Sequence, residues 1–95
     1  MTFKVPTVDL TDESIQFTFD HDGETYAIPF MQHIPMSVLE AADKRGGVGH
    51  IPVLEELGLQ GAADAWKTMS PFQIRAVTTA WTEASAASLG ESKAS

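Results

Sequence analysis

Hydrophobic and polar residues alternate most regularly between residues 15 and 30. Ile15, Phe17 and Phe19 are separated by polar residues, which is the two-residue period of a strand with one buried face. The dipeptide Asp22-Gly23 follows, and it favours a two-residue hairpin turn because both turn positions need positive φ. A hairpin with this turn places the large apolar residues of both arms on one face, namely Ile15, Phe17, Phe19, Tyr26, Ile28 and Phe30.

Residues 35–87 change to the three- and four-residue spacing of helices. Pro35 suits the first position of a helix that Gly46-Gly47 ends. A second helix is predicted from Pro52 to the glycine at position 58, and a third over residues 62–69 with Trp66 as its apolar anchor.

The last helix has the clearest start. Ser70 and Gln73 form a capping box around Pro71, so the helix is predicted from Pro71 to about Ala87. One face of this helix is apolar and contains Ile74, Val77, Ala80, Trp81 and Ala84.

These elements predict one small α+β domain, an N-terminal β-hairpin packed on three to four short helices. We expect an extended polar segment over residues 1–14 and the domain over residues 15–87. Within the domain, the hairpin takes residues 15–30 and the helices lie within residues 35–87. Residues 88–95 are predicted to form a flexible polar tail.

Charge and composition narrow the class of partner. The chain has 13 acidic and 6 basic residues, a net charge of −7, and six of those negative charges lie in residues 1–40. Nucleic acid and anionic membranes are therefore unfavoured partners. No apolar run is long enough to cross a bilayer, and residues 1–9 do not resemble a signal peptide. The lack of cysteine fits a reducing cytoplasm.

No pattern in the chain is typical of a catalytic, cofactor or metal site. The spacing of His21, His33 and His50 matches no compact ligand motif. The glycines of residues 46–49 lack the Lys-Ser/Thr of a phosphate-binding loop and fit a connector. Glu55-Glu56 are helix neighbours that point apart, so we expect an exposed charged face. We predict a protein that is not an enzyme and has no cofactor or metal.

The large apolar residues of the last two helices have two alternative roles. Core packing against the hairpin is favoured, because a chain of this size has few large side chains with which to form a core. The alternative is that part of the set stays exposed and binds a partner helix. The candidate partner-binding residues are Trp66, Ile74, Val77 and Trp81.

Three short motifs, in this order, resemble a known family. They are DGETYAIP in the hairpin (residues 22–29), AWTEAS in the last helix (80–85) and SLGESKAS at the end (88–95). Together they resemble the tail assembly chaperones of long-tailed phages that infect actinobacteria. The resemblance covers roughly residues 15–95.

The resemblance implies a function and a set of partners. Such proteins coat the long helical tape-measure protein and keep it soluble until tail-tube subunits polymerise around it. They act in the host cytoplasm and are absent from the mature virion. A longer, frameshifted form of the same protein is a further partner that the family implies.

Two other classes of function stay open on the sequence alone. One is a small acidic protein-binding module, either antitoxin-like or a nucleic-acid mimic, which would occupy a basic surface. The other is a structural head–tail joining protein, which would remain in the virion. Self-assembly into a homo-oligomer is compatible with each of them.

The resemblance predicts a feature of the gene. We expect a G/A slippery run at the codons around Gly90, followed by a longer overlapping frame. Sequencing the coding region and mass spectrometry of the two products test this. A coding region without such a run counts against the resemblance.

Overall fold

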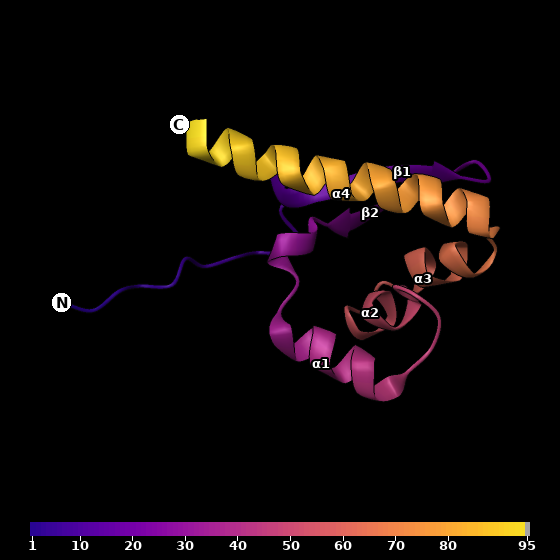
Figure 1. The fold of residues 1–95 in the computed structure, drawn as a ribbon, viewed down its shortest axis with the longest axis horizontal. Coiled ribbons are helices and arrows are strands. Elements are labelled where there is room, and N and C mark those ends of the chain that lie inside the picture. The colour runs from indigo at the N-terminus through magenta and orange to yellow at the C-terminus, as the bar shows by residue number, and fades with distance from the viewer. Residues whose placement is uncertain (95) are drawn as a thin grey trace.

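The computed structural model describes the backbone of residues 1–94 and the side chains of residues 1–89. Its elements confirm the α+β class, because one antiparallel hairpin is followed by four α-helices. In chain order they are the 3₁₀ turn η1 (Glu13–Ile15), strands β1 (Gln16–His21) and β2 (Glu24–Pro29), the turn η2 (Met31–His33), and helices α1 (Met36–Arg45), α2 (Ile51–Glu56), α3 (Gln60–Lys67) and α4 (Pro71–Ala94). Figure 1 shows α4 running along the hairpin in the upper part of the view, with α1, α2 and α3 below them.

The hairpin has the predicted register. Phe17 pairs with Ile28 and Phe19 with Tyr26, and the turn residues Asp22 and Gly23 have φ of 51° and 81°. Ile15 lies in η1 rather than in β1, so the first strand begins one residue later than the alternation suggested.

The short helices begin and end close to the predicted positions. Gly46, with φ of 73°, ends α1, and its N–H donates to the carbonyl of Ala42. Gly58, with φ of 79°, ends α2 and allows the Leu59 N–H to donate back to the Leu54 carbonyl at 3.0 Å. This compact turn lets α3 begin at Gln60, two residues before the predicted start.

Helix α4 begins as predicted but ends later. The Ser70 N–H donates to Gln73 Oε1 at 2.8 Å and the Gln73 N–H to Ser70 Oγ at 3.3 Å, which is the capping box. The expected end near Ala87 was wrong, because α4 continues to Ala94. Residues 86–89 carry no stop signal, and a single interior glycine costs only about 1 kcal/mol. The predicted tail is therefore helical over residues 88–94, and Ser95 lies outside the described residues.

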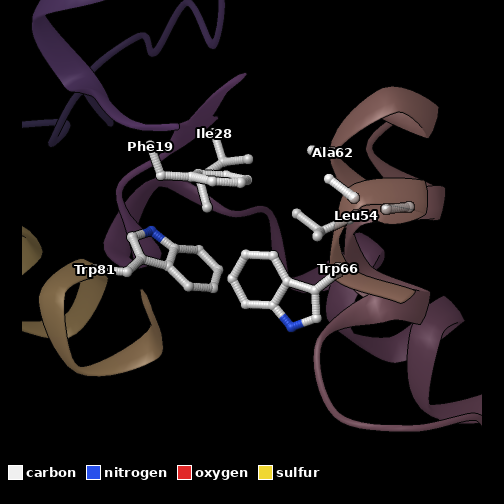
Figure 2. Packing of buried hydrophobic residues seen from close by; sticks show 8 residues of the cluster. Phe19, Ile28, Leu54, Ala62, Trp66 and Trp81 are labelled. Atoms are coloured by element: carbon white, nitrogen blue, oxygen red, sulfur yellow. The ribbon is translucent and has the colours of Figure 1, made fainter. Parts of the chain in front are cut away.

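The core forms around two tryptophans that join the helices to the hairpin. The rings of Trp66 (α3) and Trp81 (α4) meet edge to face, with centroids 6.0 Å apart and planes at 73° (Figure 2). Phe19 of β1 packs on Trp66 at 5.7 Å and 84°. Trp66 is 1% exposed and Trp81 is fully buried, as are Ile28 and Leu54.

Hydrogen bonds join α4 to the end of β2 and to η2. The indole N–H of Trp81 donates to the Pro29 carbonyl at 2.9 Å, and both groups are buried. The Met31 N–H donates to the hydroxyl of Ser85, also a buried residue, at 3.0 Å. By contrast, the indole N–H of Trp66 is buried and has no hydrogen-bond partner among the described residues.

This contrast predicts different costs for the same substitution at the two tryptophans. Both changes to phenylalanine remove similar volume, but only Trp81→Phe also leaves the buried Pro29 carbonyl without its donor. We expect losses of about 2–4 kcal/mol in unfolding free energy for Trp81→Phe and about 1–2 kcal/mol for Trp66→Phe. Urea denaturation measures both losses in unfolding free energy, provided that each variant has the same m-value as the natural chain. Equal losses would contradict the assigned role of the hydrogen bond.

Candidate partner-binding groove

A large hollow lies between α4 and the loop that joins α1 to α2. It has a volume of about 720 Å³. We call it the α4 groove, and the residues that line it are Val48, Gly49, His50, Pro71, Ile74, Arg75, Thr78, Thr79, Thr82 and Glu83.

The loop wall depends on glycine. Gly46, Gly47 and Gly49 all have positive φ, which lets the chain between α1 and α2 turn tightly and leaves the Val48 side chain 74% exposed. At Gly47, a Cβ would lie only 2.9 Å from Cγ of Pro52, so no larger residue fits without a shift. Two residues of the predicted connector, Val48 and Gly49, therefore form part of one wall of the groove.

The opposite wall is one face of α4. Ile74 provides a half-buried apolar side chain, and Thr78, Thr79 and Thr82 also line this wall. The Thr82 hydroxyl donates to the Thr78 carbonyl at 2.9 Å, so it is already satisfied within the helix. The groove therefore offers a partner mainly apolar contacts.

Opposite charges lie near the two ends of this wall. Arg75 and Glu83 are eight residues apart on α4, which is about 12 Å along a helix. Both residues are exposed. A partner would therefore meet a cation near the start of α4 and an anion farther along.

His50 connects the groove to the core. Its ring packs edge to face on Trp81 at 5.2 Å and lies 6.4 Å from Trp66. Burial lowers the pKa of His50 from its ordinary value of 6.5, because the half-buried site disfavours the charged imidazolium. The histidine is also the N-cap of α2, where a positive charge is unfavourable.

The structure separates the four predicted partner-binding residues. Ile74 lines the α4 groove, and Val77 is half-buried on the other flank of α4, beside β1. Trp66 and Trp81 lie in the core, which is the first of their two proposed roles, so neither side chain is accessible to a partner. The sequence pattern did not identify Val48 as a groove residue, because it lies 26 positions from Ile74 and no local period connects them.

The carboxylates expected to form an exposed face are instead paired. Glu55 accepts hydrogen bonds from Lys67 at 3.0 Å and Arg45 at 3.5 Å, and Glu56 pairs with Arg45. The bond from Lys67 is the main cause that lowers the pKa of Glu55. Glu55 and Glu56 are half-buried, and these ion pairs connect α1, α2 and α3 on the surface.

Among the residues that the structure describes, no group of three or more histidine and acidic side chains is arranged to hold a metal ion. None of the helices described has the length and apolarity needed to cross a membrane.

Comparison with protein-family models, with curated proteins and with solved structures finds no match for this chain.

His50 makes stability depend on pH. Its pKa is lower in the folded chain than in the unfolded chain, so the unfolded chain binds more protons as the pH falls through 6.5. We expect Tm to fall from pH 7.5 to pH 5.5, and to fall less in His50→Gln. Thermal melts of both proteins at both pH values measure the difference. An identical fall in the two proteins would show that His50 does not contribute.

Proposed function

We propose that this protein is a non-enzymatic phage tail assembly chaperone that binds the tape-measure protein and keeps it soluble. The observation that carries the proposal is the α4 groove. It is an open and mainly apolar hollow beside a long helix, and its volume is about 720 Å³. The three short motifs that resemble this family support the choice of client. A chaperone of this kind needs apolar contact area and no catalytic site.

The shape of the groove suits a helical client. A helix presents apolar side chains at three- and four-residue steps, and such a stripe can lie along α4 against Val48 and Ile74. A single contact of this size is weak, but the tape-measure protein is a very long helix. Many copies bound along one client would together keep its apolar surface away from other chains.

The far end of α4 suits the second task of the family, the recruitment of tail-tube subunits. Ser85 is the last buried residue described in α4, and Figure 1 shows the C-terminal end of the helix projecting past the core. Residues added by a longer frameshifted form would continue from this end, away from the α4 groove. The protein would work in the host cytoplasm and be absent from the mature virion.

Coexpression with the tape-measure protein of the same phage tests the proposal. Val48→Asp places a carboxylate in the groove, and we expect binding to weaken about tenfold or more because the charge would be buried against an apolar client. Met36→Asp is the matched control, since Met36 is 77% exposed and lies outside the groove. The soluble fraction of the client and pull-down affinity are the measurements.

The other classes of function give different results in the same experiment. Equal solubility of the client with and without this protein would overturn the chaperone proposal. Binding that is lost with added salt or on removal of surface carboxylates would indicate an acidic protein-binding module. Recovery of the protein from purified virions would indicate a head–tail joining protein.

A further inference from the structure

Residues 1–9 form an extended arm that is exposed along its whole length. Figure 1 shows the arm leading away from the rest of the chain. Phe3 and Val5 are strongly exposed apolar residues, and they alternate with Thr2 and Lys4. An isolated strand with this alternation has one apolar side that no described residue covers.

The base of the arm is fixed in direction. The Asp9 carboxylate accepts hydrogen bonds from the N–H and hydroxyl of Thr11, at 3.0 and 2.6 Å. Gln16, at the start of β1, donates through its side chain to the Leu10 carbonyl at 2.8 Å. These bonds form a turn where the arm joins the hairpin.

The outer edge of β1 is free to accept a strand. A two-residue turn makes His21–Glu24 a hydrogen-bonded pair, so bonded and non-bonded pairs alternate back along the hairpin. The bond from the Phe30 N–H to the Ile15 carbonyl, at 2.9 Å, agrees with this alternation. The backbone groups of Thr18 and Asp20 therefore point away from β2, and no other described residue bonds to them.

An apolar hollow lies beside this edge. It has a volume of about 210 Å³ and is formed between β1 and the start of α4. We call it the β1 hollow, and its lining includes Phe19, His21, Met69, Phe72, Ala76 and Val77. Phe72 is 79% exposed there, which is unusual for so large an apolar side chain.

We infer that the arm of one copy binds as a third strand along β1 of a second copy. Residues 2–5 supply the strand, and Pro6 ends it because proline cannot continue a ladder. Phe3 and Val5 then enter the β1 hollow against Phe72, while Lys4 lies on the other face of the sheet with Asp20.

Charge favours this occupant. Lys4 is the only lysine or arginine in residues 1–40, and it lies on the arm. Three exposed carboxylates surround the receiving end of the hairpin, on Asp20, Asp22 and Glu24. An arm and a hairpin from two copies therefore attract each other, although the chain as a whole carries a net charge of −7.

The contact uses two different surfaces of the chain. Two copies can exchange arms and close as a dimer, or each can pass its arm to the next and form a ring or an open chain. The β1 hollow and the α4 groove lie on opposite flanks of α4 and have no lining residue in common. Arm exchange therefore leaves the α4 groove open and does not depend on the proposed chaperone function.

Engineered cysteines test the contact, since the natural chain has none. Val5→Cys is mixed with a size-tagged Ala76→Cys under mild oxidation, and the products are separated on a non-reducing gel. We expect a disulfide-linked heterodimer from this pair. The matched control replaces Ala76→Cys with Val48→Cys, which is exposed but lies in the α4 groove, and should give several-fold less product.

The remaining outcomes decide against the inference. If Val5→Cys and Ala76→Cys give no more heterodimer than the control pair, the inference is overturned. A disulfide that forms only within single molecules of the double variant Val5→Cys/Ala76→Cys would show that the arm binds its own chain, and would also overturn the inference.

Size-exclusion chromatography with light scattering gives a second measurement. Phe3→Ser/Val5→Ser, which removes the apolar side chains without adding charge, should be monomeric, whereas Thr2→Ser/Thr7→Ser should retain the oligomer.

Discussion

The contact between Trp66 and Trp81 holds the two parts of the molecule together. The strands and short helices are each too small to bury their own apolar faces, and the two indoles supply the surface on which they meet. Phe19 of the hairpin packs on Trp66, and Trp81 bonds the carbonyl of Pro29 at the end of β2. In the hairpin register the Pro29 carbonyl points away from β1, so it takes its donor from α4 instead.

This single line of attachment determines what α4 can do. Its buried residues, Trp81 and Ser85, lie four positions apart on one stripe, and both flanks of that stripe are left uncovered by the core. One flank borders the glycine-rich loop and forms the α4 groove, while the other borders the free edge of β1. A small chain thus has two distinct apolar surfaces, one suited to a helix and one to an extended strand.

Features that depend on neighbouring residues were predictable from the sequence. The register of the hairpin follows from Asp22-Gly23 and strand alternation, and the start of α4 follows from Ser70 and Gln73. The roles of the tryptophans were not predictable, because periodicity shows that a residue lies on an apolar stripe and not which part of the stripe is covered. The groove was missed for a related reason, since its walls come from Val48 and from α4, which only tertiary packing brings together.

The accessibility of the two indoles tests this arrangement most directly. Iodide quenching of tryptophan fluorescence, measured in the native chain and in urea, reports whether each indole contacts solvent. The single-tryptophan variants separate the two signals. Burial of Trp66 and Trp81 predicts almost no quenching of either indole in the native state and full quenching after unfolding. Strong native quenching of either one would contradict the account, because the core that positions both flanks of α4 would then be open.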